Sequence, residues 1–566
     1  MDAANPPILW FGRLELPNVF ITTFIFGFSA MPDTVSTQAT TVITTSYSGD
    51  YRIDVLLPSA SARWNFGSPV GTPVTVSYSF MAAAPTYADD SDKKGFTAFN
   101  AEQMSATRQI LNLISQQVGI TFQEVSDSAT SYGDIRFGNN AQGQTSAGYA
   151  TFPDTTDRNS AGDLYINNED TSNLSNITVG TNSYATLVHE IGHTLGLKHP
   201  GNYNAGEPAA TTPDNFLAKA EDSEATTVMS YVKTPQRTER EFFGPYDLLA
   251  LKYLYGIVAY NSTDTSYVYD KAVGQRQVMI DDTGGADTID FSAILMGATV
   301  DLTAGAFSSV GVLEDGVTAA INNLSIAYDV VIENATGGPA NDTLRGNAAT
   351  NNLRGNGGND TISGGTGNDT IDGGSGIDTA SYSGSRAGFA LTRTAGGFSL
   401  VDTVGLEGTD ALSTVERIKF ADGSIALDVA ATQAAGQAQL LLGAVLGKNL
   451  LATKQPIIGA VIGLIDDGAY SLQVLAGALM RLDIWGILAN GGNATATNTQ
   501  IANYLLTTVN GAVPDSTTLA SAVTALNTEL DFASQGGFLW SLAQTSANQQ
   551  QVGLVGLAIT GLAYAV

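Results

Sequence analysis

The chain contains three histidines, and all three lie within one short segment of its 566 residues. The segment reads His-Glu-Ile-Gly-His-Thr-Leu-Gly-Leu-Lys-His and places the imidazoles at His189, His193 and His199. Residues four apart project from the same face of a helix, so the first two rings are expected about one turn apart. Imidazole nitrogens are common zinc ligands, and we therefore expect one catalytic Zn²⁺ here.

Two further residues of the segment complete the expected zinc site. Glu190 lies between the first two histidines, where its carboxylate reaches the metal-bound water rather than the metal. Gly196 is where the helix should end, because glycine tolerates the left-handed conformation that turns a chain sharply. That turn brings His199 back as the third ligand and leaves one coordination position for water. The alternative, three ordinary core histidines, is disfavoured by the length of the motif.

The full pattern HExxHxxGxxH resembles the metzincin signature, which is accompanied by a downstream methionine turn. The chain has this turn as Val-Met-Ser-Tyr at residues 228–231. Its Met-Ser-Tyr form resembles that of the serralysins, which are secreted bacterial zinc proteases. The resemblance implies that Tyr231 is a fifth, displaceable zinc ligand that also helps to stabilise the oxyanion. Without it, we would interpret Tyr231 as one of 21 tyrosines packed in a core. We interpret Met229 as a packed floor beneath the metal, because thioether sulfur suits Zn²⁺ poorly beside three imidazoles.

Composition excludes several classes of protein. The formal net charge is −29, so a nucleic acid would be repelled and is not an expected partner. The chain has no cysteine, which excludes disulfides and thiolate zinc sites. Strong acidity suits a calcium-binding or secreted protein, and calcium can supply the cross-linking that disulfides would otherwise give. No apolar run reaches the length of a membrane span, so we expect no transmembrane segment.

An α/β domain is expected around the histidine segment. Its expected elements are strands at 74–80, 134–137 and 164–166, and helices at 101–118, from an N-cap at Ser183 to Leu195, and at 246–256. The resemblance places residues 148–150 and 163–167 at the upper rim of a cleft, where a peptide would add as an edge strand. A plain sheet strand is the alternative for both segments. Residues 201–224 are expected to form a long surface loop.

Residues 336–380 are a run of nine-residue repeats, of which the third and fourth read RGNGGNDTI and SGGTGNDTI. The pattern resembles the RTX repeat, whose parallel β-roll binds Ca²⁺. Each repeat is expected to be half a turn of the roll, with its apolar position in the core at Leu344, Leu353, Ile362 and Ile371. A flexible linker would not need an apolar residue every nine positions. The segment 284–289 resembles a degenerate earlier repeat.

Calcium needs six to eight oxygen ligands, which two stacked turns of such a roll supply from carboxylates and carbonyls. The expected calcium-binding residues are Asp342, Asp360, Asp369, Asp378, Gly355, Gly357, Gly364, Gly367, Gly373 and Gly376. Aspartates eighteen residues apart should stack, which places Asp342, Asp360 and Asp378 on one edge of the roll. Asn351 and Asp369 lie on the other edge, where the neutral Asn351 predicts weaker binding. The second repeat also lacks most of its glycines.

We predict an α/β (α+β) metzincin catalytic domain at 46–258, an all-β parallel RTX β-roll at 259–428, and an all-α accessory domain at 429–566. Helices of the accessory domain are expected near 435–453, 456–465, 498–509, 515–532 and 551–566. Residues 1–45 form an N-terminal extension, either a propeptide or, before Met31, upstream sequence. By the resemblance, the last domain carries a signal for export by a type I secretion ABC transporter.

The predicted function is that of a secreted, zinc-dependent endopeptidase stabilised by several structural Ca²⁺ ions, with protein or peptide substrates outside the cell or at its surface. One alternative is a calcium-dependent surface-layer or adhesion protein whose protease domain is idle. The intact histidines and Glu190 disfavour idleness. The second alternative, another metzincin branch, is disfavoured by the Met-Ser-Tyr turn together with the RTX repeats. Retention at the cell surface is a further open role for the accessory domain.

Overall fold

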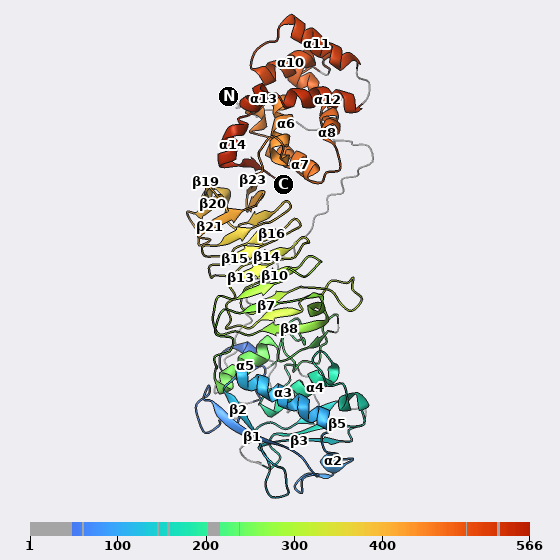
Figure 1. The fold of residues 1–566 in the computed structure, drawn as a ribbon, viewed down its shortest axis with the longest axis vertical. Helices are drawn as coiled ribbons and strands as arrows, with labels where there is room; N and C mark the ends of the chain where they lie inside the picture. Colours follow the sequence, from blue (N-terminus) through green and yellow to red (C-terminus); the bar gives the residue numbers. More distant parts are fainter. Residues whose placement is uncertain are drawn as a thin grey trace, which may run out of the picture. The chain divides into compact units, whose positions relative to one another are not determined.

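The computed structural model describes residues 48–58, 62–143, 146–154, 159–201, 216–236, 238–493, 495–528 and 532–565. The proposed N-terminal extension, the start at Met31 and most of the predicted 201–224 loop lie outside these residues. The chain divides into two compact units, with the boundary between Thr370 and Ile371. Each unit is described by itself below (Figure 1).

The catalytic domain of the first unit is built on a five-stranded sheet, and its predicted strand at 74–80 is confirmed as β1 (Val74–Phe80). The strand order is β2-β1-β3-β5-β4. Strands β1, β2 (Ile120–Glu124), β3 (Ile135–Asn140) and β5 (Asp163–Asn167) run parallel, and β4 (Gly148–Ala150) pairs antiparallel with β5 at the edge. Every residue of β3 and β5 is buried, as expected for the centre of a sheet with covered faces.

The main helices of this domain also follow the sequence pattern. Helix α3 (Ala101–Gln117) begins at a capping box formed by Asn100 and Gln103, and buries Ile110, Leu111 and Ile114. Helix α4 (Asn182–Thr194) carries the first two histidines. Helix α5 (Pro245–Tyr255) ends at Gly256, which has φ +94°. Shorter elements are α1 (Tyr51–Asp54), α2 (Asp90–Lys93), the 3-10 helix at Thr171–Leu174 and β6 (Glu239–Arg240).

A parallel β-roll follows in the same unit. One series of paired strands is β7 (Ser266–Val268), β9 (Thr288–Asp290), β13 (Asn334–Thr336) and β15 (Asn352–Arg354). The other is β10 (Thr299–Asp301), β14 (Thr343–Arg345) and β16 (Thr361–Ser363). Leu344 pairs with Ile362, so residues eighteen apart stack, as predicted. The degenerate repeat at 284–289 is a rung of the roll, because Ile289 pairs with Ala335 and is fully buried.

A smaller sheet lies between the catalytic domain and the repeats in the chain. It has the order β11-β12-β8-β6, with β8 at Arg276–Ile280, β11 at Phe307–Ser308 and β12 at Leu324–Ile326. Strand β6 of the catalytic domain pairs with β8, and Lys252 of α5 donates to buried Asp281 just after β8. The catalytic domain and the beginning of the roll are therefore joined by backbone pairing as well as by a buried ion pair.

The second unit begins with the last strands of the roll. Strand β18 (Thr379–Ser381) pairs with β22 (Arg417–Phe420), which pairs in turn with β23 (Gly423–Ala426). Strands β19 (Phe389–Thr394), β20 (Gly397–Asp402) and β21 (Thr409–Ser413) form an antiparallel meander. Strand β17 (Thr370–Asp372) spans the boundary between the units.

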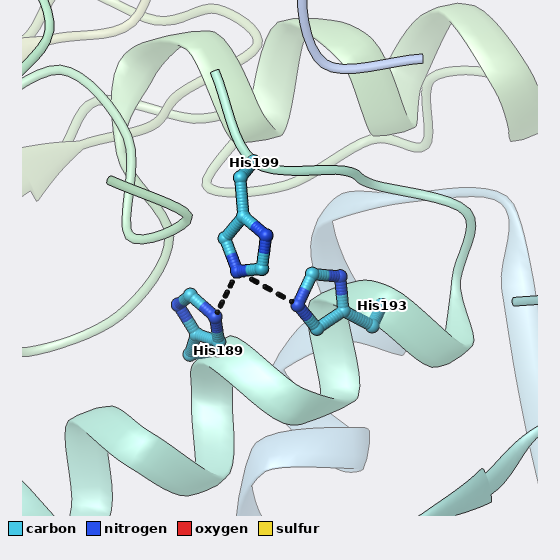
Figure 2. Close-up of side chains that lie close together, drawn as sticks. All are labelled: His189, His193 and His199. Carbon is cyan, nitrogen blue, oxygen red and sulfur yellow. Dashed lines mark hydrogen bonds between the residues drawn. The ribbon is translucent and has the colours of Figure 1, made fainter. Parts of the chain in front are cut away.

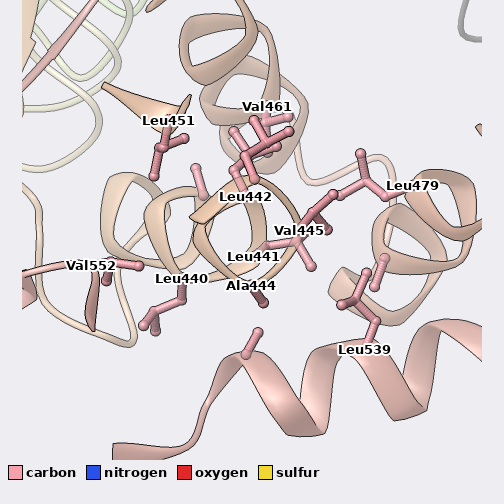
Figure 3. Close-up of a cluster of buried hydrophobic side chains, with 14 of the residues drawn as sticks. Leu440, Leu441, Leu442, Ala444, Val445, Leu451, Val461, Leu479, Leu539 and Val552 are labelled. Carbon is pink, nitrogen blue, oxygen red and sulfur yellow. The ribbon is translucent and has the colours of Figure 1, made fainter. Parts of the chain in front are cut away.

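The accessory domain is helical, as predicted, and packs around α6 (Ala434–Leu451). Figure 3 shows Leu441, Leu442 and Val445 of α6 surrounded by side chains of other helices, among them Val461, Leu479 and Leu539. The other helices are α7 (Gln455–Asp466), α8 (Leu472–Met480), α9 (Trp485–Ala489), α10 (Asn498–Asn510), α11 (Ser516–Thr528), α12 (Phe532–Ala543), α13 (Ser546–Gln551) and α14 (Leu554–Thr560). None of the helices within the described residues is long and apolar enough to cross a membrane.

The prediction of a helix near 551–566 was wrong at its end. Helix α14 stops at Thr560, and β24 (Leu562–Tyr564) pairs antiparallel with β23. Leu562 and Tyr564 are buried against the helical core, while backbone pairing with β23 satisfies the strand's hydrogen-bonding groups. Tertiary pairing thus overrides the local helix-like composition. Helices α8, α9, α12 and α13 were not predicted.

Candidate active site

The histidine-bearing helix begins and ends at residues whose backbone conformations explain its limits. Thr181 is extended, and its hydroxyl accepts a hydrogen bond from the Tyr184 N–H at 3.3 Å. The predicted N-cap, Ser183, is therefore wrong, since it lies inside the helix. At the other end, Gly196 has φ +96°, and a Cβ atom there would lie 2.1 Å from the Ala62 carbonyl oxygen. Only glycine fits this turn, as predicted.

The turn brings the three histidines together (Figure 2). The Nε2 atoms of His189 and His193 lie 3.0 and 3.1 Å from the Nε2 atom of His199. Two ligands of a tetrahedral zinc ion, each at about 2.0 Å, would lie roughly 3.3 Å apart. The nitrogen atoms therefore have close to the separation that a single zinc ion requires.

Backbone carbonyls fix the orientation of two of the rings. The Nδ1 atom of His189 lies 2.7 Å from the Val228 oxygen, and that of His193 lies 2.7 Å from the Leu197 oxygen. Each Nδ1 therefore donates its proton to a carbonyl, which leaves the Nε2 lone pair directed at the centre of the triad. Burial lowers the pKa of His189 to about 3 and that of His193 well below its usual value. His189 and His193 are thus neutral imidazoles, the form that binds a metal.

The next feature of the site is the carboxyl group of Glu190. It is buried, and within the described part of the chain its Oε2 atom has no hydrogen-bond partner. Burial raises the pKa of the Glu190 carboxyl to about 8. A buried carboxyl with an unpartnered oxygen beside a triad of imidazoles is a candidate functional group rather than a packing residue.

Gly148 leaves the space that Glu190 occupies, and sequence reasoning missed this role. A Cβ atom on Gly148 would lie 2.9 Å from Cγ and 3.1 Å from Oε1 of Glu190. The edge strand β4 therefore passes directly beside the carboxylate. The signal in the sequence was a glycine at the first position of a short predicted strand, but its neighbour across the fold was not visible there.

The methionine turn lies beneath and beside the triad. Met229 is fully buried, and its Sδ atom would lie 2.7 Å from a Cβ added to Gly192 of helix α4. Tyr231 is 55% exposed, and its ring is stacked on that of His189 with centroids 5.6 Å apart. Its centroid is 4.7 Å from that of His199. The structure therefore places Tyr231 at the open side of the triad and Met229 on the closed side.

Asp247 of α5 holds the methionine turn in place, and the sequence analysis did not predict this role. Its carboxylate accepts from the N–H groups of Val228 and Gly244, both at 2.7 Å, and from the Thr227 hydroxyl. The carbonyl of the same Val228 accepts from His189. Asp247 therefore holds the residue that orients a metal-binding ring. The available signal was a carboxylate in the first turn of a mostly apolar helix.

The predicted calcium-binding residues form stacked turns along the roll. The Oδ1 atom of Asp360 accepts from the Asp342 N–H at 2.7 Å, and that of Asp369 accepts from the Asn351 N–H at 2.8 Å. These aspartates and Asp378 are buried. A Cβ on Gly364 would lie 2.1 Å from Oδ2 of Asp369, and one on Gly373 would lie 2.7 Å from Oδ2 of Asp378. The glycines therefore form cradles around carboxylates, which suits Ca²⁺.

The remaining predicted glycines lie in the same turns. Gly367 and Gly376 have φ +123° and +141°, which favours glycine. The Gly355 carbonyl faces Gly337 across the stack, and the Gly357 N–H donates to the Gly338 carbonyl at 3.2 Å.

A helix with two histidines four apart, a third histidine after a glycine turn, and a buried methionine turn beneath them define a metzincin-type zinc site. The Matrixin family model matches residues 85–206, and the model for the Peptidase M10 serralysin C terminal matches residues 252–442. In these two regions the chain is similar to the serralysin-type metzincins.

Individual relatives agree with these matches. The chain is 37% identical to serralysin from Proteus mirabilis over 322 residues, which cover 50% of this chain and 62% of the relative. It is 32% identical to the metallopeptidase AprA from Pseudomonas marginalis over 330 residues, which cover 53% and 66%. Serralysin B from Dickeya chrysanthemi is 32% identical over 324 residues, covering 53% and 64%. The chain thus spans just under two thirds of the length of these relatives.

Proposed function

We propose that the protein is a secreted zinc-dependent endopeptidase that cleaves extracellular or cell-surface proteins. The observation that carries this proposal is the convergence of three Nε2 atoms beside the buried carboxyl of Glu190. Similarity to serralysins and to AprA, of which the latter is named a metalloprotease, supports it.

His189, His193 and His199 would hold the zinc ion, which supplies a Lewis acid and a water molecule of lowered pKa when bound. Glu190 accepts the proton of the attacking water and delivers it to the leaving amine. The Tyr231 hydroxyl donates a hydrogen bond to the developing oxyanion. The unpaired side of edge strand β4 offers backbone groups with which an extended peptide can pair beside Glu190.

The other predicted roles are proposed on the same basis. Asp342, Asp360, Asp369 and Asp378, with the glycines of their turns, would bind several structural Ca²⁺ ions. Domain limits at 46–258, 259–428 and 429–566 are supported by the ends of helix α5 at Tyr255 and of strand β23 at Ala426. Export by a type I transporter rests on the serralysin resemblance, and retention at the cell surface is a separate proposal for the helical domain.

Hydrolysis of casein by the wild type and by Glu190→Gln tests the enzymatic proposal. The substitution keeps the size of the side chain but removes the base, so we expect a loss of about 10²–10⁴-fold in kcat. Zinc content, measured by atomic absorption, should stay at one ion per chain in both proteins. Equal activity would refute the role of Glu190. Two folded, zinc-loaded and inactive proteins would instead favour the surface-layer or adhesion alternative.

A further inference from the structure

One turn of the roll is built differently from its neighbours. In the turn at 337–342, Asp342 accepts hydrogen bonds with both carboxylate oxygens, from Gly338 N–H at 2.6 Å and from Ala298 N–H at 2.7 Å. The turn at 346–351 has Asn351 in the place of Asp342 and Asn347 in the place of Gly338. It therefore contains two side-chain amides where the other turn has a carboxylate and a glycine.

These two amides bond to each other and to the preceding turn. Asn351 Oδ1 accepts from the Asn347 N–H at 2.8 Å, and Asn351 Nδ2 donates to the Glu333 carbonyl at 3.0 Å and to Asn347 Oδ1 at 3.1 Å. Asn347 Nδ2 donates to the carbonyls of Ile332 at 2.7 Å and Leu302 at 3.1 Å. Asn347 Oδ1 also accepts from the Ala349 N–H at 2.8 Å.

Backbone partners fix the orientation of both amides. Each amide oxygen faces a backbone N–H, and each amide nitrogen faces a backbone carbonyl. Rotating either amide by half a turn would place like groups against each other. The N–H groups therefore point at the oxygen atoms of the preceding turn, and these oxygens are the kind of ligand that Ca²⁺ would need.

A calcium ion does not fit this turn, because the amide of Asn351 stands where the neighbouring turns have a carboxylate, and its hydrogens already occupy the Glu333 carbonyl oxygen. The neutral Asn351 also separates the buried Asp369 from Glu333 along the same edge, so this rung adds no charge to the stack. We propose that the turn at 346–351 is a metal-free rung, closed by the amides of Asn347 and Asn351, which stays folded when calcium is withdrawn.

The consequence is a roll whose rungs differ in their need for calcium. In the turns at 337–342 and 355–360, the buried Asp342 and Asp360 stack on one edge of the roll, and a cation must offset the mutual repulsion of their carboxylates. The amide-closed rung holds its own shape through neutral hydrogen bonds, which are fully satisfied without a metal. The amide-closed rung is therefore already folded when the calcium-dependent turns stack against it.

Hydrogen exchange read by mass spectrometry on the full chain tests this proposal without using proteolytic activity. Exchange is compared in calcium and after chelator treatment followed by re-addition of zinc, with helix α3 as an internal reference for a folded catalytic domain. In the absence of calcium we expect the backbone amides of Asn347 and Ala349, whose acceptors lie within the same turn, to exchange at least about tenfold more slowly than those of residues 355–369, because their hydrogen bonds need no metal. Equal loss of protection in both groups of amides would overturn the proposal.

A matched pair of variants sharpens the test. Asn351→Asp replaces the donating amide with a negative carboxylate, whereas Asn352→Asp makes the same charge change at an exposed neighbouring position. Without calcium, Asn351→Asp should lose the protection of 346–354, and Asn352→Asp should keep it. With calcium, both should be protected as in the wild type, which shows that the variant folds. Identical behaviour of the two variants without calcium would contradict the role of the amides.

Discussion

At the scale of single residues, the role of the Tyr231 hydroxyl can be tested separately from that of its ring. Its half-exposed ring stacks on His189, and we propose that its hydroxyl stabilises the oxyanion. Tyr231→Phe should keep the stacking and the zinc but lower kcat about 10²-fold or more, with KM little changed. Steady-state kinetics on a peptide substrate measures both constants.

Tyr253→Phe on helix α5 provides the control, because it removes the same hydroxyl from a tyrosine outside the site. If Tyr231→Phe and the control have equal kcat values, Tyr231 acts only as a packed aromatic ring.

The histidine triad could be predicted from sequence, while two residues that position its neighbours could not. The spacing of His189 and His193 determines their common helix face, and Gly196 determines where the chain reverses toward His199. Gly148 and Asp247 act through contacts with residues distant in sequence, at Glu190 and Val228. No local pattern reports such contacts.

At the scale of elements, the methionine turn is held by a helix that contributes no ligand to the triad. Asp247→Asn on helix α5 would replace the carboxylate with a neutral amide and so weaken the hydrogen bonds accepted from the N–H groups of Val228 and Gly244. The Val228 carbonyl should then orient His189 less well. We expect zinc to dissociate about 10–100-fold faster, as is typical when a group behind a metal ligand is lost.

Release of zinc to a chromogenic chelator measures this rate. Asp90→Asn, at an exposed position of helix α2, removes a carboxylate of the same domain without touching the turn. Unchanged zinc release in Asp247→Asn would show that the turn does not depend on helix α5.

The elements themselves were predicted best where the pattern was long or periodic. The roll was predicted in register, because a buried apolar residue recurs every nine positions from Leu344 to Ile371. In the accessory domain, by contrast, helices α8 and α12 lie in short apolar stretches, and the single capping residue Ser471 before α8 did not suffice to predict a helix there. Strand β24 depends on its pairing with β23, which composition does not encode.

At the scale of the whole molecule, a buried ion pair joins the catalytic domain to the roll. The Nζ atom of Lys252 on helix α5 donates to Asp281 at 2.7 Å and to Asp329 at 2.8 Å. Lys252→Met would leave the buried Asp281 without its cation, and we expect a loss of about 3–5 kcal/mol in the free energy of unfolding. Urea denaturation in the presence of calcium and zinc measures this change.

The double variant Lys252→Met, Asp281→Asn should recover part of that loss, because it removes the uncompensated charge. If the double variant is as unstable as the sum of the two single variants, the pair does not couple the two elements.

Strands β23 and β24 are antiparallel neighbours, with Ala426 opposite Leu562 and Ser424 opposite Tyr564. The whole helical domain lies between them in the chain and therefore takes the place of a hairpin loop. The chain enters and leaves this domain at adjacent points of one sheet. The helical domain can therefore change in length and sequence, as an inserted domain can, while β23 and β24 keep their pairing register.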